Sequence, residues 1–229
     1  MPTTQKTLMF LSGFVTSLGS FVTVCIVLAT PKWVTGIIKF SDGIFSNGSF
    51  FITYGLFRGE NTQEMDAGLG SSGSHFEVLK ILSDSSPKSI HVVVIIFMFF
   101  SLFTSLLSSG LTLFNSISNP YQTWLGPTSI FLCNGLNMAF IVLVLILFVV
   151  NTQANDLSIM ILSVFYPMDT YIYGSKTHLY QYSFWLLLLI LFFNITTIII
   201  IVYYQKAKYY RKKELQKPME EAPKDGILF

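Results

Sequence analysis

The last long apolar stretch, residues 184–204, restricts what this chain can fold into more than any other feature. It contains no Asp, Glu, Lys, Arg or His, and as an α-helix it would be about 31 Å long, close to the thickness of a bilayer's hydrocarbon core. It ends in Tyr203 and Tyr204, and a group of cations follows: Lys206, Lys208, Arg211, Lys212 and Lys213. Aromatic rings favour the membrane–water interface, and Lys and Arg beside a span are retained in the cytosol. The stretch therefore predicts a transmembrane helix followed by a cytoplasmic tail, residues 205–229.

Three further apolar stretches predict three more spans, at residues 8–30, 90–114 and 128–150. The first could also be a signal peptide, because Val27-Leu28-Ala29 resembles a cleavage site. Its apolar run is longer than the ~7–15 residues of a signal peptide's core, so an uncleaved span is favoured. Composition agrees, since 52% of the residues are hydrophobic and only 11% are charged, against about 25% charged residues in soluble domains.

Four spans place both termini on the same side of the membrane, and the cationic tail assigns that side to the cytosol. The segments between the spans follow from this assignment. They are a cytoplasmic N-terminus (1–7), a first outward loop (31–89), a cytoplasmic loop (115–127) and a second outward loop (151–183). The predicted location is the plasma membrane, with the lipid bilayer as an obligatory partner.

Small and polar side chains predict how the spans contact one another. In the first span Ser12, Thr16 and Ser20 recur every four residues, a stripe that allows close approach of another helix in lipid. The stripe fits packing within the molecule, which is favoured, and also a dimerisation face. The second span carries a polar face, and the third contains two asparagines expected in the bundle interior. These residues are Ser101, Ser105, Ser108, Ser109, Thr112, Asn134 and Asn137.

The two outward loops predict a small sheet. Residues 33–40 and 50–57 are rich in β-branched and aromatic residues and are separated by turn-forming residues. Residues 168–173 could add one more strand, whereas the Gly/Ser-rich segment 67–74 is expected to be mobile. The predicted fold class is an all-α membrane protein, a left-handed four-transmembrane-helix bundle with a small extracellular β-sheet.

The sequence disfavours several kinds of chemistry. No span carries an ionisable residue well inside it, and such residues usually mark ion paths or proton relays. His91, at the edge of the second span, is expected to be an interfacial residue and not a ligand. His75 and His178 are isolated, and neither a Cys-x-x-Cys nor a His-Glu-x-x-His motif occurs. We therefore expect no catalytic residues, no cofactor and no metal. The net charge of +2 implies no nucleic acid partner.

Trp33 and the segment Tyr54-Gly55-Leu56-Phe57 resemble the loop motif of the claudin-like tetraspan superfamily. Further segments resemble one of its families, the clarins: Arg58-Gly59, Asn119-Pro120-Tyr121, Gly126-Pro127, Tyr182-Ser183-Phe184-Trp185 and Asp225-Gly226-Ile227-Leu228-Phe229. The chain departs from the superfamily in one respect, since residues 61–69 contain no cysteine where claudin-like loops carry a pair. That departure argues against a disulfide-clamped loop and against a tight-junction-like role.

The resemblance implies a non-enzymatic plasma-membrane protein that organises or traffics other membrane proteins, in a family linked to the sensory perception of sound. This inference rests on analogy between family members. The alternative is an auxiliary subunit of a channel or transport complex, which would form its pore jointly with other chains.

Two short motifs predict modification and binding. Asn47-Gly48-Ser49 is an N-glycosylation sequon in the first outward loop, whereas Asn194-Ile195-Thr196 lies within a span, out of reach of the glycosylation machinery. The chain ends with apolar Ile227 and Phe229 at alternate positions, a pattern that a cytoplasmic PDZ scaffold can bind. The tail could instead serve only as a topology signal that contacts anionic lipid.

Overall fold

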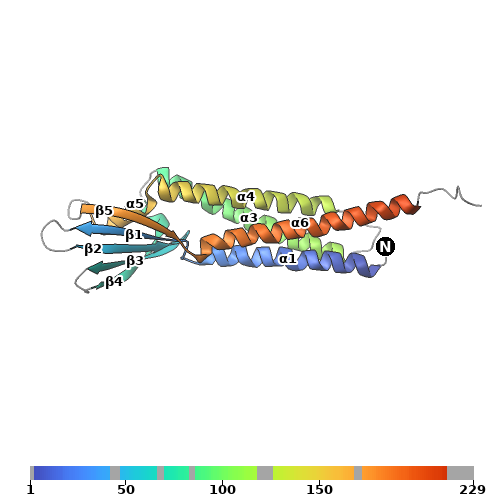
Figure 1. Ribbon diagram of the computed structural model, residues 1–229, viewed down its shortest axis with the longest axis horizontal. Coiled ribbons are helices and arrows are strands. Elements are labelled where there is room, and N and C mark those ends of the chain that lie inside the picture. The colour runs from blue at the N-terminus through green and yellow to red at the C-terminus, as the bar shows by residue number, and fades with distance from the viewer. Residues whose placement is uncertain are drawn as a thin grey trace, which may run out of the picture.

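Four long helices lie side by side and carry an antiparallel sheet at one end, as the computed structural model shows (Figure 1). The structure describes residues 3–41, 47–65, 70–82, 86–117, 126–167 and 172–215. The long helices are α1 (Thr3–Ala29), α3 (Ser86–Ile117), α4 (Pro127–Gln153) and α6 (Tyr182–Leu215). Helix α1 begins, and α6 ends, at the end of the bundle opposite the sheet (Figure 1). We call these two ends the sheet end and the termini end.

All four long helices are long and apolar enough to cross a membrane. Helices α3 and α4 each contain the corresponding apolar stretch and continue beyond it by a few residues, whereas α6 continues past its stretch to Leu215 and includes the group of cations. Around the bundle, α1 packs against α3 and α6, and α4 packs against the same two helices. The predicted fold class, a four-helix membrane bundle with a small sheet, is thus confirmed.

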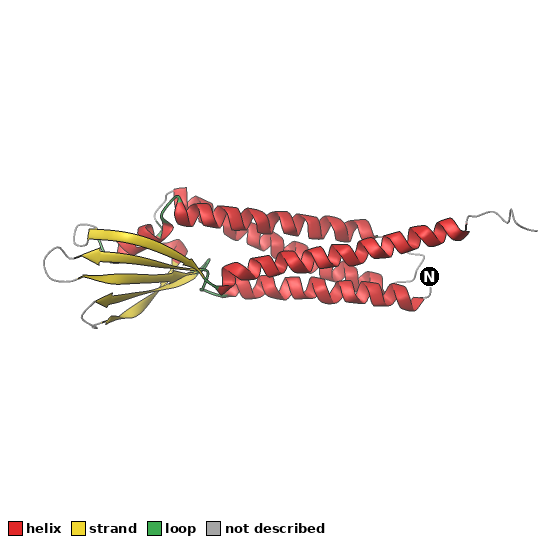
Figure 2. Ribbon diagram, viewed as in Figure 1, coloured by secondary structure: helices red, strands yellow, loops and turns green. Residues whose placement is uncertain are grey.

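The sheet contains five strands in the order β4-β3-β2-β1-β5. Strands β1 (Val34–Ser41), β2 (Asn47–Tyr54), β3 (Arg58–Met65) and β4 (Gly70–Glu77) follow one another along the chain. Strand β5 (Ile172–Tyr180) comes from the second loop and pairs antiparallel with β1. The two loops therefore build a single sheet, with β4 and β5 at its edges (Figure 2).

The expectation of a mobile Gly/Ser-rich segment at residues 67–74 is wrong from Gly70 onwards. This part forms β4, because β3 offers it a partner strand and the Asn61 side chain fixes it. The Asn61 Oδ1 atom accepts hydrogen bonds from the Ser74 backbone N–H at 3.0 Å and from the Ser74 hydroxyl at 2.7 Å. The last predicted strand lies in β5 from Ile172 onwards, and residues 168–171 fall outside the described residues.

The largest group of buried side chains lies at the junction between the sheet and the bundle. Two short helices, α2 (Val78–Ile81) and α5 (Leu157–Phe165), complete this region. The Phe50 ring stacks on Tyr166, just after α5, with ring centroids 4.2 Å apart. Fully buried side chains from the sheet, the residues next to its strands, α4 and α5 form one continuous cluster: Trp33, Ile38, Phe50, Ile52, Tyr54, Leu56, Phe148 and Ile161. The sheet is therefore fixed to the bundle by a shared apolar core.

Helix α1 contacts its neighbours through a face next to the predicted stripe. Ser12 is exposed and its hydroxyl bonds back to Met9 O at 2.9 Å, so it takes no part in the helix contact. Thr16 is half-buried and Ser20 is fully buried. Most of the buried positions recur at alternating three- and four-residue intervals: Phe10, Gly13, Ser17, Ser20, Val24 and Val27. This spacing keeps one face of the helix against the bundle.

Candidate functional site at the junction and in the bundle core

Trp33 connects three parts of the molecule. Its side chain is fully buried, and its indole N–H donates a hydrogen bond to Val27 O of α1 at 3.0 Å. Its ring lies 4.8 Å from that of Phe148 in α4, measured between centroids. Its backbone N–H donates to Tyr54 O at the end of β2, at 3.1 Å. Trp33 therefore fixes the start of the sheet to two transmembrane helices.

Gly55 and Leu56 continue this junction where β2 ends. A Cβ atom at Gly55 would lie 2.6 Å from the carbonyl oxygen of Thr30 and 2.8 Å from Pro31 Cα, so only glycine fits against this backbone. The Leu56 side chain is buried, and its carbonyl accepts a hydrogen bond from His91 Nε2 at 2.8 Å. Phe57, the last residue of the motif, is exposed.

His91 is fully buried, so the expectation of an interfacial position is wrong. The helix α3 begins before the apolar stretch, at Ser86, which places the imidazole beneath the loop formed by Gly55 and Leu56. The nitrogen that donates to Leu56 is thereby defined, because a carbonyl oxygen can only accept. His91 connects the loop motif to α3 and binds no other ligand among the described residues.

Tyr54, Ser158 and His178 form a chain of polar contacts beneath the sheet. The Tyr54 hydroxyl lies 3.0 Å from Ser158 Oγ, and Ser158 Oγ lies 3.3 Å from His178 Nδ1. Burial raises the pKa of Tyr54 to about 12, and burial is also the main cause that lowers the pKa of His178. Both groups are therefore neutral near pH 7. Sequence reasoning missed this cluster, because its members come from three separate segments.

A serine beside a histidine is also the pair that hydrolases use for nucleophilic attack. Ser158, however, is fully buried and Gly36 of β1 packs directly over it: a Cβ atom at Gly36 would lie 2.9 Å from Ser158 Oγ. No substrate can reach this hydroxyl in the folded protein. Within the described ranges, no group of three His, Cys, Asp or Glu residues could hold a metal ion.

Asn137 lies in the middle of the bundle and contacts all three other long helices. Its amide nitrogen donates to Asn194 Oδ1 of α6 at 3.2 Å and, less closely, to Ser20 Oγ of α1 at 3.5 Å. Its amide oxygen accepts a hydrogen bond from the Ser101 hydroxyl of α3. All four side chains are almost completely buried. The predicted interior position of Asn137 is thus confirmed, and the residue joins the four helices at one point.

A second group of polar contacts lies closer to the termini end. Asn134 donates to Ser108 Oγ and to Ile130 O of its own helix, both at 2.8 Å. Two hydroxyl pairs connect α1 to its neighbours, Ser17–Thr112 at 3.1 Å and Thr16–Thr197 at 2.7 Å. The predicted polar face of α3 is buried at all five positions. Serine, threonine and asparagine hydrogen bonds therefore hold the helices together, and none of these groups is charged.

The remaining predicted sites lie apart from the junction. Asn47 begins β2, and its backbone pairs with Ser41 of β1 at the end of these strands remote from the bundle. Asn194 is buried within α6, and its amide nitrogen donates to Ile190 O at 2.8 Å. Ile227 and Phe229 fall outside the described residues.

Four membrane-spanning helices, joined by uncharged polar contacts and topped by a sheet built from both loops, define a multi-pass tetraspan membrane protein. The sequence model of the family described as Clarin-2-like matches residues 4–201. The chain is 56% identical to Clarin-3 of Homo sapiens and 58% identical to Clarin-3 of Rattus norvegicus, in both cases over 100% of each chain. It is 29% identical to Clarin-1 of Homo sapiens over 82% of this chain and 83% of the relative. The chain belongs to the clarin family, and the predicted resemblance is confirmed.

Proposed function

We propose that this clarin is a non-enzymatic plasma-membrane protein that organises or traffics partner membrane proteins. One observation carries the proposal: hydrogen bonds between polar side chains join the four helices inside the bundle, and the spans present apolar faces outward. Exposed side chains of this kind occur on all four helices, for example Val15, Phe103, Leu132 and Phe192. A membrane domain built in this way offers its outer faces and its sheet to other proteins. The link of the clarins to the sensory perception of sound supports a role in that process.

Purification of the tagged protein from native membranes, followed by identification of the proteins retained with it, tests this function. Recovery of trafficking, adhesion or scaffold proteins, absent from an untagged control, is the expected result. Recovery of pore-forming or carrier subunits in fixed proportion would instead favour the alternative role as an auxiliary subunit of a channel or transport complex. The absence of any enriched protein would contradict both roles.

We also propose that the sheet faces outward and both termini face the cytosol, because the group of cations in the C-terminal turns of α6 is typical of a cytoplasmic flank. This arrangement predicts a glycan at Asn47 and none at Asn194. N-glycosidase treatment should increase the mobility of the wild-type band, and Asn47→Gln should remove the shift. Thr196→Ala is the matched control, because it removes the second sequon and leaves Asn194 in place. A shift that persists in Asn47→Gln would contradict the proposed topology.

The cytoplasmic tail is proposed to bind a PDZ scaffold through its last residues. A bound tail would add as a strand to the PDZ sheet, with Phe229 and Ile227 in pockets and the terminal carboxylate held by backbone N–H groups. Titration of a peptide of the last ten residues against a panel of PDZ domains measures this. We expect micromolar binding that is lost on Phe229→Asp and on amidation of the C-terminus. Equal binding of the free and amidated peptides would contradict the proposal and favour a tail that contacts only anionic lipid.

A further inference from the structure

Two neighbouring cavities meet at Arg58, where α1 gives way to the sheet. The lower cavity, of about 480 Å³, lies against the last turns of α1 and is lined by Cys25, Leu28 and Ala29 together with Phe57. The upper cavity, of about 780 Å³, lies against β3, β4 and the end of α2. Pro31 and Arg58 line both cavities. The two spaces therefore adjoin and form one groove, which runs from the face of α1 to the sheet.

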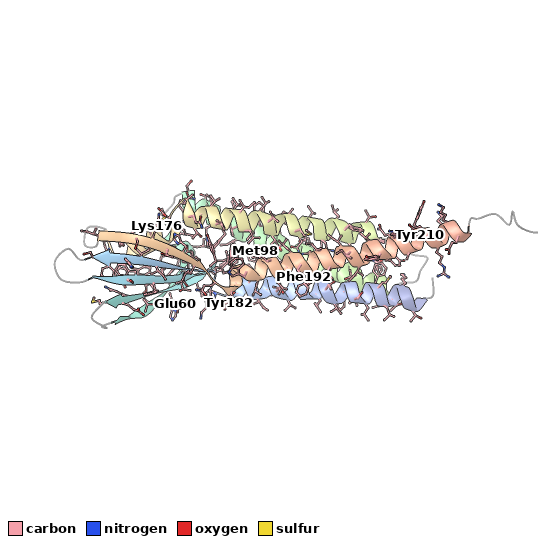
Figure 3. All side chains as sticks on the ribbon, viewed as in Figure 1. Glu60, Met98, Lys176, Tyr182, Phe192 and Tyr210 are labelled. Atoms are coloured by element: carbon pink, nitrogen blue, oxygen red, sulfur yellow. The ribbon has the colours of Figure 1, made fainter. Side chains whose placement is uncertain are left out.

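The lower cavity lies at the level where the hydrocarbon core of the membrane ends. Cys25 and Ala29 are exposed on the outer face of α1, within one turn of the end of the helix. At the sheet end of α6, Tyr182 and Trp185 are also exposed, as aromatic residues commonly are at the membrane–water interface. Figure 3 shows Tyr182 at this junction, with Glu60 on the sheet side of it. An acyl chain of the surrounding lipid can therefore lie along Cys25, Leu28 and Ala29.

Arg58 is an exposed cation at the boundary between the two cavities. Its side chain forms no hydrogen bond or ion pair with another described residue, although Glu77 faces it in the register of β3 and β4. Glu77 pairs instead with Lys80, with a separation of 3.0 Å between Nζ and Oε2. The guanidinium is thus available to an anion at the depth of lipid phosphate groups. Arginine is well suited to that role, because its planar donors can bind a phosphate in a bidentate manner.

Beyond Arg58 a different set of side chains lines the groove. Glu60 and Glu77 bring carboxylates into the upper cavity, and Lys80, which also lines it, pairs with Glu77. The rings of Phe76 and Phe165 line the same cavity, with centroids 5.3 Å apart. Glu60 has no ion-pair partner among the described residues and faces His75 across the two strands. Carboxylates and aromatic rings together attract quaternary ammonium groups. From the membrane outward the groove is therefore first apolar and then cationic at Arg58, and beyond that it presents the unpaired carboxylate of Glu60 beside aromatic rings.

We propose that the groove binds one phosphatidylcholine molecule from the membrane leaflet on the sheet side. An acyl chain lies along the end of α1, the phosphate binds the Arg58 guanidinium, and the trimethylammonium group enters the upper cavity near Glu60. The order of charges in the groove matches the order of groups in this lipid. An anionic lipid such as phosphatidylglycerol places no cation next to the Glu60 carboxylate. A partner's transmembrane helix would fill only the apolar part and leave Arg58 without an anion.

Native mass spectrometry of the full chain in a mild detergent, with phosphatidylcholine and phosphatidylglycerol added at equal concentration, tests this binding. We expect the wild type to retain one phosphatidylcholine in preference to phosphatidylglycerol. Arg58→Gln should lower the retained phosphatidylcholine about tenfold, the effect of losing one charge-assisted contact. Lys32→Gln is the matched control, because Lys32 is an exposed cation close to the end of α1 that lines neither cavity.

The contribution of the Glu60 carboxylate to lipid preference can be measured separately. The variant Glu60→Gln should lose the preference for phosphatidylcholine over phosphatidylglycerol, whereas Glu64→Gln, on the exposed part of β3 outside both cavities, should keep it. Gel filtration shows whether each variant remains folded. Equal retention by the Arg58→Gln and Lys32→Gln variants would overturn the proposal. An equal or greater retention of phosphatidylglycerol by the wild type would overturn it as well.

Discussion

Trp33→Ala is expected to lower the free energy of unfolding by about 3–5 kcal/mol, the range observed when a buried Trp or Phe is truncated. The substitution removes the indole hydrogen bond to Val27 O and the ring contact with Phe148, and it leaves a cavity where β1 joins α1 and α4. Because the same residue positions the first strand, the sheet should loosen together with the junction. The fraction of protein that stays monodisperse after heating in detergent, and the amount at the cell surface, should both fall sharply.

Trp185→Ala provides the control for this prediction, since it deletes the same side chain where it is 56% exposed. Its N–H contact with Tyr180 O, at 3.3 Å, lies in an exposed position. Substitutions at exposed sites of this kind usually change stability by less than about 0.5 kcal/mol. Similar losses in Trp33→Ala and Trp185→Ala would show that the junction does not depend on Trp33.

Asn137→Leu is expected to lower the free energy of unfolding by about 2–4 kcal/mol, because it removes two or three interhelical hydrogen bonds in lipid. Leucine is similar in size to asparagine, so the main effect is the loss of partners for Asn194, Ser101 and Ser20. The measurement is again survival of the monodisperse protein after heating. Leu136→Ala, at the neighbouring position where the side chain faces outward, should have a much smaller effect.

The coupling between Asn137 and Asn194 gives this prediction a second test. Removing one partner leaves the other buried without its hydrogen bond, whereas removing both avoids that penalty. The double variant Asn137→Leu/Asn194→Leu should therefore cost clearly less than the sum of the two single variants. Additive costs would contradict the contact that joins α4 to α6.

Much of the membrane domain follows from local sequence. The four apolar stretches specify helices because a backbone in lipid must satisfy its own hydrogen bonds. Asn134 and Asn137 were assigned to the interior for a related reason, since an amide facing lipid lacks partners. The paired strands β1 and β2 were also foreseen approximately, from their β-branched and aromatic residues. In each case the residue type alone determines the favourable environment.

Other elements could not be found in this way. Strand β4 contains Gly70, Ser74 and other residues that favour flexible chain, and it is a strand because β3 and the Asn61 side chain provide its partners. The position of His91 depends on where the loop between β2 and β3 folds back onto α3. The contact face of α1 runs through Ser17 and Ser20 instead of Ser12, because the rotation of a helix is set by its neighbours.

The sequence by itself determined that this chain has four membrane-spanning helices and that no charged side chain lies well inside them, because those properties depend on transfer of each residue between water and lipid. It also identified the clarin loop motif at Trp33 and Tyr54–Phe57 without revealing its role. Only the tertiary structure showed that this motif fastens the sheet to α1, α3 and α4. Likewise, only the fold brings Arg58 and Glu60 of β3 beside the end of α1. Contacts between residues distant in the chain depend on how the helices and strands pack, and no local pattern encodes that packing.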